Sequence, residues 1–228
     1  MSFSRKGLPV KFINKPKRPF AAILGGAKVS DKIIVIEKLL EKIQILVVGG
    51  GMACTFLKAN GTHVGASIVE ETLLDYAKNL IHNIQKKGVE LFLPIDLVIA
   101  DSLTERAKLK VIEIGTTIPK NWMILDIGPM TSELYCEAIQ SSKTVFWNGP
   151  MGAFEIQPFD QGTNTIANYV AKRTIEKKLI SIAGGGDTVS AIKASGSVPK
   201  FSYVSTAGGA FLEWLEGKSL PGVEALKL

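Results

Sequence analysis

The sequence predicts a single domain of the α/β class, with a doubly wound, mostly parallel sheet and helices on both faces. Two patterns and one composition value predict it. Short apolar runs alternate along the chain with segments of helical spacing, and several of the runs stop at glycine. Hydrophobic residues make up 46% of the 228 residues, which is enough for a continuous core. Runs that are apolar throughout predict strands buried on both sides, as in a Rossmann-like sheet covered by helices.

The expected strands are the apolar runs. In chain order they are "FAAIL" (20–24), "IQILVV" (43–48), "VELFLP" (89–94), "MILDIGP" (123–129), "TVFWNGP" (144–150), "LISIA" (179–183) and "FSYVST" (201–206). Four of the runs stop at glycine-rich turns, which are Gly25-Gly26, Gly49–Gly51, Gly184–Gly186 and Ala207–Gly209. Because ligands of such sheets bind beyond the carboxyl ends of the strands, these turns predict a ligand crevice at one edge.

The expected helices follow the strands and show apolar residues at intervals of three to four. They cover residues 30–42, 52–60, 132–142, 164–178, 188–195 and 210–217. Ser30 or Asp31 is the expected N-cap of the first helix, because a short side chain with an oxygen atom can accept its free N–H groups. We expect residues 20–228 to form one domain, preceded by an arm or linker remnant over residues 1–19.

The net charge of +6 comes from this arm. Residues 1–19 hold six basic residues and no acidic one, which leaves 21 basic and 21 acidic residues in the remainder. A basic arm can bind nucleic acid or an anionic membrane, or belong to a transit peptide, but we interpret this one as a solvated tail. No apolar segment approaches the roughly 20 residues that span a bilayer. We therefore expect no nucleic-acid and no membrane partner.

Cysteine and histidine spacing indicates a reduced intracellular protein. Cys54 and Cys136 are far apart without a CxxC pair, and His63 and His82 form no ligand pair. This pattern favours packed free thiols over a disulfide scaffold or a structural zinc site. We expect a monomer in the cytoplasm.

Lysine, glycine and aspartate at the crevice predict a magnesium–nucleotide site. Lys28 and Lys32 lie four residues apart at the start of the first expected helix, which puts both ammonium groups on one side. Glycine turns before helices bring backbone N–H groups close to phosphate. Asp187 in "GGGDT" can hold Mg²⁺ against the same phosphates, because Mg²⁺ commonly uses one or two carboxylates together with phosphate oxygens.

The motifs of other nucleotide-binding families match the sequence less well. "GGAKVSDK" is not a Walker A loop, and the protein-kinase motifs are absent from the sequence. "GGGMAC" comes near the dinucleotide fingerprint but has Cys54 in place of its third glycine. An NAD-dependent enzyme would also leave the lysine pair unexplained. Thr188 and Ser205 have no histidine in their motifs, so we expect no covalent nucleophile.

Seven motifs, in this order, resemble the phosphoglycerate kinase family. They are "LGGAKVSDK", "VVGGGMACTFLKANG", "LPIDLVIAD", "NWMILDIGP", "VFWNGPMGAFE", "AGGGDTVSAI" and "STAGGAFLEWLEGKSLPGVEAL". The resemblance covers residues 15–228 and is to the C-terminal, nucleotide-binding domain; the family's N-terminal domain is expected to be absent. It implies the glycolytic transfer of a phosphoryl group between 1,3-bisphosphoglycerate and MgADP, which gives 3-phosphoglycerate and MgATP.

The resemblance also implies roles for single residues, in a reaction that needs positioning and charge neutralisation. Lys28 would contact the transferring phosphoryl group, Lys32 the α-phosphate, and Asp187 the Mg²⁺. The others would surround the nucleotide: Gly185, Gly186 and Thr188 at the β-side phosphates, Asn148 near the phosphates, Glu155 at the ribose, Gly49 and Gly50 beside the adenine, and Gly208 and Gly209 at the developing charge.

Three residues depart from the family pattern: Ala207 replaces a glycine, Ala153 replaces a valine near the adenine, and Ile124 stands where many members have glycine. None of them removes a charged or metal-binding group, so nucleotide binding is expected to survive. Phosphoglycerate would be bound only if an N-terminal domain were supplied, so we expect little turnover from the chain alone. The alternatives are one half of a split enzyme that needs an N-terminal partner, and a non-catalytic nucleotide-binding protein.

Overall fold

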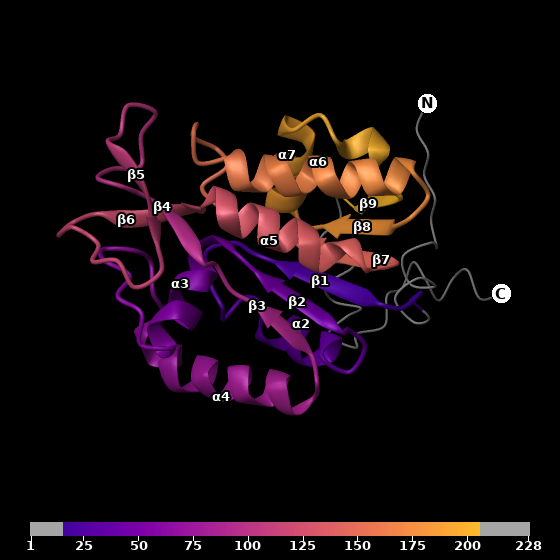
Figure 1. Ribbon diagram of the computed structural model, residues 1–228, viewed down its shortest axis with the longest axis horizontal. Helices are drawn as coiled ribbons and strands as arrows, with labels where there is room; N and C mark the ends of the chain where they lie inside the picture. The colour runs from indigo at the N-terminus through magenta and orange to yellow at the C-terminus, as the bar shows by residue number, and fades with distance from the viewer. Residues whose placement is uncertain (1–15, 206–228) are drawn as a thin grey trace.

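The computed structural model describes residues 16–205, arranged in layers (Figure 1). A central sheet lies between helices, with a smaller sheet at one end of the molecule. The predictions on residues 1–15 of the arm, on Ala207, Gly208 and Gly209, and on the helix expected over residues 210–217 lie outside the described residues.

The central sheet has six strands in the order β3-β2-β1-β7-β8-β9. Their bounds are β1 Phe20–Leu24, β2 Ile45–Val48, β3 Glu90–Phe92, β7 Thr144–Asn148, β8 Ile180–Gly184 and β9 Tyr203–Ser205. Every neighbouring pair runs parallel, which confirms the predicted sheet. The chain builds outward from β1 to β3 and then returns to β7 on the other side of β1. The strand order therefore reverses between β1 and β7, and open α/β sheets bind ligands at such a reversal.

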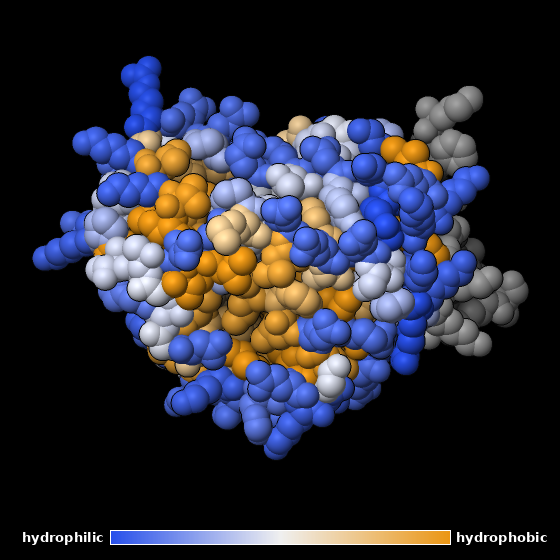
Figure 2. All heavy atoms as spheres, in the orientation of Figure 1, coloured by the Kyte–Doolittle hydropathy of each residue, from blue (hydrophilic) through white to orange (hydrophobic). Residues whose placement is uncertain are grey.

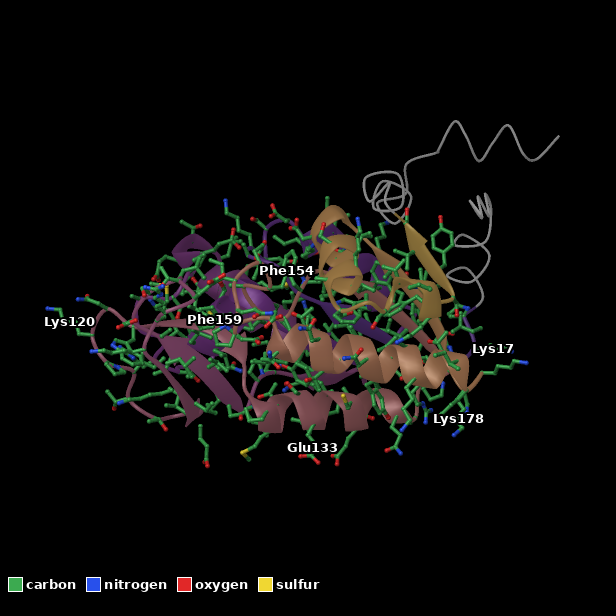
Figure 3. All side chains as sticks on the ribbon, turned by 90° about the horizontal axis from the view of Figure 1, so that it is seen from above. Lys17, Lys120, Glu133, Phe154, Phe159 and Lys178 are labelled. Atoms are coloured by element: carbon green, nitrogen blue, oxygen red, sulfur yellow. The ribbon has the colours of Figure 1, made fainter. Side chains whose placement is uncertain are left out.

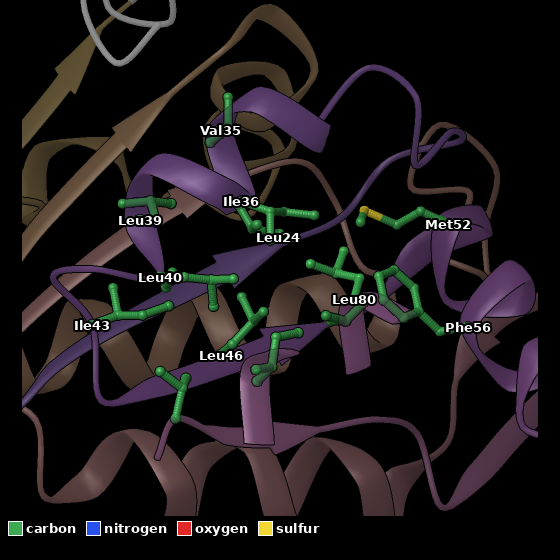
Figure 4. Close-up of a cluster of buried hydrophobic side chains, with 14 of the residues drawn as sticks. Leu24, Val35, Ile36, Leu39, Leu40, Ile43, Leu46, Met52, Phe56 and Leu80 are labelled. Carbon is green, nitrogen blue, oxygen red and sulfur yellow. The ribbon is translucent and has the colours of Figure 1, made fainter. Parts of the chain in front are cut away.

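Helices cover both faces of this sheet, as the sequence predicts. One layer holds α2 Ile33–Leu39, α3 Gly50–Ala59 and α4 Leu74–Lys86, and the other holds α5 Pro129–Gln140, α6 Gln161–Ile175 and α7 Gly186–Ala194. Two short 3-10 helices are η1 Glu71–Leu73 and η2 Val198–Lys200. Alternate residues of β1 face opposite layers: Ala22 and Leu24 pack with the first, Ala21 and Ile23 with the second. Figure 4 shows the hydrophobic core between the sheet and the layer of α2, α3 and α4, in which Leu24 lies among side chains of these helices.

A three-stranded antiparallel sheet, in the order β5-β4-β6, forms the smaller layer. Its strands are β4 Asp96–Ala100, β5 Leu109–Glu113 and β6 Met123–Ile127. The sequence predicts β6 as a strand but not its place in a second sheet, and it misses β4, β5 and α4. These elements fall outside the strand–glycine–helix pattern on which the prediction depends. The inner face of the small sheet packs Leu97 and Ile99 against Cys54 and Leu57 of α3.

The start of α2 also differs from the prediction. The helix begins at Ile33 after Lys32 as N-cap, and no side chain caps it. The expected N-cap, Ser30 or Asp31, is wrong because the turn before the helix is tied to a neighbouring segment: the Ser30 hydroxyl donates to Glu70 Oε1 at 2.5 Å.

The surface separates charged from apolar side chains. Figure 2 shows apolar residues gathered in the middle of one face, with charged residues around them. Lys17, Lys120 and Lys178 lie at the periphery, whereas Phe159 is fully buried (Figure 3). Among the helices that the structure describes, none is long and apolar enough to cross a membrane.

Candidate functional site

The loops that follow β1 and β7 meet where the strand order reverses. The Gly25 N–H donates to the Asn148 carbonyl and the Gly26 N–H to the Pro150 carbonyl, both at 3.0 Å. A Cβ atom on Gly25 would lie 2.0 Å from the Pro150 carbonyl oxygen, and one on Gly149 would lie 2.1 Å from the Gly25 oxygen. No side chain fits between backbones that lie so close. These two glycines therefore shape the crevice by joining its loops.

A chain of hydrogen bonds crosses this crevice. Lys32 Nζ donates to Asn148 Oδ1, and Asn148 Nδ2 donates to the Gly184 carbonyl at 2.6 Å. Asn148 is only 1% exposed, so its amide is held by these two partners. Burial lowers the pKa of the Lys32 ammonium group, while the charges of Asp31 and Asp187 oppose this shift. A partly desolvated ammonium group gains from a nearby anion, which favours a phosphate ligand here.

The start of α7 faces the same crevice. Its N-cap, Gly185, has a φ of 100°, a conformation that favours glycine. Thr188 is buried, and its hydroxyl accepts a hydrogen bond from the Gly149 N–H at 2.6 Å. Gly186 has open space where a Cβ would stand, and Asp187 is exposed. The Thr188 hydroxyl thus holds a loop, while the Asp187 carboxylate and the first-turn N–H groups are placed to meet a ligand.

The start of α3 is filled by the protein itself. Three of its N–H groups, those of Gly49, Gly50 and Met52, donate to carbonyl oxygens of β1 and of the loops after β1 and β7, at 2.8 to 2.9 Å. Gly49 and Gly50, which were expected beside the adenine, can therefore contact a base through their surface but do not offer free N–H groups.

A cavity of about 200 Å³ opens beside this turn. It lies between α3, β6 and the loop after β7, and its lining is mostly apolar, with Gly50, Ile124 and Ala153 among the lining residues. Glu155 and Asp187 also line it. The structure therefore brings together the residues expected at the adenine, the ribose and the metal.

Lys28 lies in the loop between β1 and α2, with an exposed side chain. It forms no ion pair with the residues that the structure describes. The two residues after it are held more firmly, because the N–H groups of Val29 and Ser30 donate to Glu70 Oε2 at 2.6 and 3.0 Å. Sequence reasoning missed Glu70, since nothing in the local sequence around Glu70 and Glu71 indicates a contact with a loop 40 residues away.

The family model for phosphoglycerate kinase matches residues 8–218. The chain belongs to the phosphoglycerate kinase family. It is 50% identical over 217 residues to the phosphoglycerate kinase of Geotalea daltonii, covering 95% of this chain and 53% of that one. It is 51% identical over 214 residues to the cytosolic phosphoglycerate kinase of Triticum aestivum, with 94% and 53% covered. The chain thus spans about half the length of the curated relatives that it matches.

Solved structures of phosphoglycerate kinases share the fold. The enzyme of Coxiella burnetii superposes with a TM-score of 0.89 at 45% identity, covering 96% of this chain and 55% of that one. The enzyme of Pyrococcus horikoshii gives a TM-score of 0.73 at 26% identity, with 96% and 54% covered. The predicted family and the predicted α/β fold are both confirmed.

The buried carboxyl group of Asp126 was not predicted from the sequence as part of the site in this phosphoglycerate kinase family member. Asp126, at the end of β6, lines the cavity and is 2% exposed. Its oxygens accept hydrogen bonds from the N–H groups of Gly162 at 2.8 Å and of Ile127 at 2.9 Å. Burial raises its pKa to about 8, although these hydrogen bonds oppose the shift. Asp126 therefore joins the floor of the cavity to the start of α6.

The residues available for metal binding fit a nucleotide-held ion. No cluster of three or more His, Cys, Asp or Glu within residues 16–205 could hold a metal. A single carboxylate such as Asp187 suits Mg²⁺ that takes most of its ligands from phosphate and water. Cys54 and Cys136 are free, as expected, and burial raises the pKa of their thiols to about 12 and about 11.

Proposed function

We propose that the chain binds MgADP or MgATP at the carboxyl edge of the central sheet. The observation that carries this proposal is the chain of hydrogen bonds from Lys32 through Asn148 to Gly184. It sets an ammonium group beside the ends of β7 and β8, within the electrostatic reach of Asp187, which also lines the apolar cavity. A phosphate chain attached to an apolar base matches these neighbours part by part.

Each part of the nucleotide has its own residues in this proposal. Lys28 contacts the transferring phosphoryl group, Lys32 contacts the α-phosphate, and Asn148 holds Lys32 in place. The adenine enters the cavity beside Gly49 and Gly50. The remaining contacts are made by the N–H groups of Gly185, Gly186 and Thr188 with the β-side phosphates, by Glu155 with the ribose, and by Gly208 and Gly209, outside the described residues, with the developing charge.

Mg²⁺, held by Asp187, would neutralise phosphate charge during the transfer. The chain's own contribution is to orient the phosphates with fixed ammonium and N–H groups, which need little rearrangement when charge develops. The reaction that we propose is phosphoryl transfer between 1,3-bisphosphoglycerate and ADP, giving 3-phosphoglycerate and ATP, as in glycolysis. A cytoplasmic location is part of the proposal, because the Triticum aestivum relative is named cytosolic.

Titration calorimetry with MgADP tests the nucleotide site. The unchanged chain is expected to bind, and Asp187→Ala to bind about tenfold more weakly or worse, because the metal loses its protein ligand. Asp75→Ala is the matched control, since Asp75 is an exposed acid in the first turn of α4. Equal affinities of these two variants would refute the role of Asp187. Failure of the unchanged chain to bind would refute the site.

A coupled assay tests the reaction. We propose that phosphoglycerate is held by the part of the relatives' length that this chain does not match, so the chain alone should show little turnover. Mixing it with a separately made N-terminal half of the Geotalea daltonii relative should raise the rate. A turnover of roughly 1–1000 s⁻¹ by the chain alone, or no gain on mixing, would contradict this division of tasks.

A further inference from the structure

Glu70 reaches the loop that carries Lys28 from the segment just before η1. Its Oε2 accepts hydrogen bonds from the N–H groups of Val29 and Ser30 at 2.6 and 3.0 Å, and its Oε1 accepts one from the Ser30 hydroxyl at 2.5 Å. Two consecutive residues thus donate three hydrogen bonds to one carboxylate, which fixes the direction of the backbone there. We call this set of contacts the Glu70 clamp.

The clamp has a rigid base. The Glu70 N–H donates to the hydroxyl of Thr55, a residue of α3 that is 1% exposed, at 3.2 Å. The next residue, Glu71, forms an ion pair with Lys58 of α3 at 2.5 Å. Because α3 begins at the glycine turn beside the cavity, the clamp ties the Lys28 loop to the body that forms one wall of that cavity.

The two lysines of the site depend on different anchors. Lys32 is held through its own ammonium group, which donates to Asn148. The Lys28 side chain forms no ion pair within residues 16–205, and the backbone that follows it is held by Glu70. Partial burial alone would raise the pKa of Glu70, but hydrogen bonds from Ser30 and Val29 and the charge of Lys28 lower it. The clamping carboxylate is therefore ionised at neutral pH.

We propose that Glu70 is a positioning residue for Lys28: by holding the Val29–Ser30 turn it points the Lys28 ammonium group at the phosphate end of the bound nucleotide. The inference rests on the proposed function, since it needs a nucleotide in the crevice. It adds a residue that touches neither the nucleotide nor the metal and acts through the loop alone. Glu70 thereby couples the α3 body to the charge that meets the phosphates.

A double-mutant cycle in MgATP affinity tests the inference. Glu70→Ala is expected to weaken binding about tenfold in the unchanged background and less than about twofold in the Lys28→Ala background. In the Lys32→Ala background the loss should again be about tenfold, because Lys32 has its own anchor. Equal losses in the unchanged and Lys28→Ala backgrounds would overturn the inference, since Glu70 would then act on something other than Lys28.

Two control variants separate positioning from charge and from folding. Glu71→Ala removes the same charge one residue away, where the partner is Lys58, and should change the affinity less than about twofold. Glu70→Gln keeps acceptor and donor atoms for the clamp and should restore most of the affinity that Glu70→Ala loses. A Glu70→Ala variant no weaker than Glu71→Ala would overturn the inference.

Amide hydrogen exchange gives a readout that needs no nucleotide. The N–H groups of Val29 and Ser30 should exchange at least about tenfold faster in Glu70→Ala than in the unchanged chain, while the amides of β7 keep their rates. Unchanged exchange at both positions would overturn the clamp itself. If amide exchange is faster as expected but the unchanged chain binds no MgATP, both the proposed function and the positioning role are refuted. If Glu70→Ala binds MgATP as tightly as the unchanged chain, only the positioning role is refuted.

Discussion

The two sides of the candidate site are built on different principles. The proposed phosphate side consists of the start of α2 and the carboxyl ends of β7 and β8, joined by hydrogen bonds among Lys32, Asn148 and Gly184. The base side consists of α3, β6 and the loop after β7, and it is lined mainly by apolar groups. Charged ligand groups need donors in fixed directions, whereas an apolar ring needs a slot of the right size. Substitutions on the phosphate side should therefore weaken binding by displacing the donor groups. Substitutions on the base side should change binding by altering the volume of the cavity.

The largest effect is expected at the junction of the phosphate side. Gly25→Ala places a Cβ 2.0 Å from the Pro150 carbonyl oxygen, so the loops must move apart. We expect the free energy of unfolding to fall by about 3 kcal/mol or more, measured by urea denaturation. Gly186→Ala is the matched control, because open space surrounds that position, and it should change stability by less than about 1 kcal/mol. Equal losses would mean that the junction is not the rigid part of the site.

Removal of Lys32 should separate the two sides functionally. Lys32→Ala deletes the ammonium group that Asn148 holds, and we expect MgADP affinity to fall about 30-fold. Adenosine, which has no phosphate, should bind within about twofold of the unchanged chain. Calorimetric titrations with both ligands measure the difference. If adenosine weakens as much as MgADP, the sides are not independent.

The pH dependence of stability tests the base side. The pKa of Asp126 is about 8 in the folded chain against an ordinary value of 3.8, so the folded chain keeps a proton that the unfolded chain releases. This contribution is therefore complete below about pH 4 and is lost as the pH rises towards 8 and beyond. The free energy of unfolding should fall by about 1 kcal/mol or more between pH 5 and 9. Asp126→Asn should show a flatter profile, and an equally steep one would assign the slope to other groups.

The smallest effect on binding is expected from a change in the volume of the apolar cavity. Ala153 lines the cavity, and Ala153→Val adds two methyl groups to its wall. We expect MgADP and adenosine to bind about twofold to fivefold more tightly, by the same factor, because the gain comes from apolar contact alone. A gain confined to MgADP would place Ala153 on the phosphate side instead.

The central sheet was predictable because most of its strands lie in largely apolar runs and four of them, β1, β2, β7 and β8, end at glycine. The small sheet was not, since charged residues interrupt β5 at Lys110 and Glu113, and β4 is followed by Asp101 instead of glycine. Its antiparallel pairing depends on packing against α3, which the local sequence does not reveal. The N-cap of α2 was wrong for a related reason, because the partner of Ser30 comes from a distant segment.

In the site, Lys28, Lys32 and Asp187 were predictable from their places beside glycine turns and helix starts, whereas Asn148 came from the family resemblance. The structure brings Lys32, Asn148 and Asp187 together, and it shows Glu70 accepting hydrogen bonds from the backbone that follows Lys28. Glu70 and Asp126 were not predictable, since each acts through a contact 36 to 41 residues away along the chain. The contacts of each residue with the nucleotide remain predictions.

The filled start of α3 has a consequence for molecular discrimination. The N-terminus of a helix that begins after a glycine turn commonly binds a pyrophosphate group, and dinucleotide-binding proteins depend on that interaction. Here the positive end of α3 already faces backbone oxygens of the chain, because Gly49, Gly50 and Met52 have donated their N–H groups to them. A cofactor with a second nucleotide would therefore find three of the N–H groups beside β2 already paired. Under the proposed function, these hydrogen bonds predict weaker binding of a dinucleotide than of ADP or ATP.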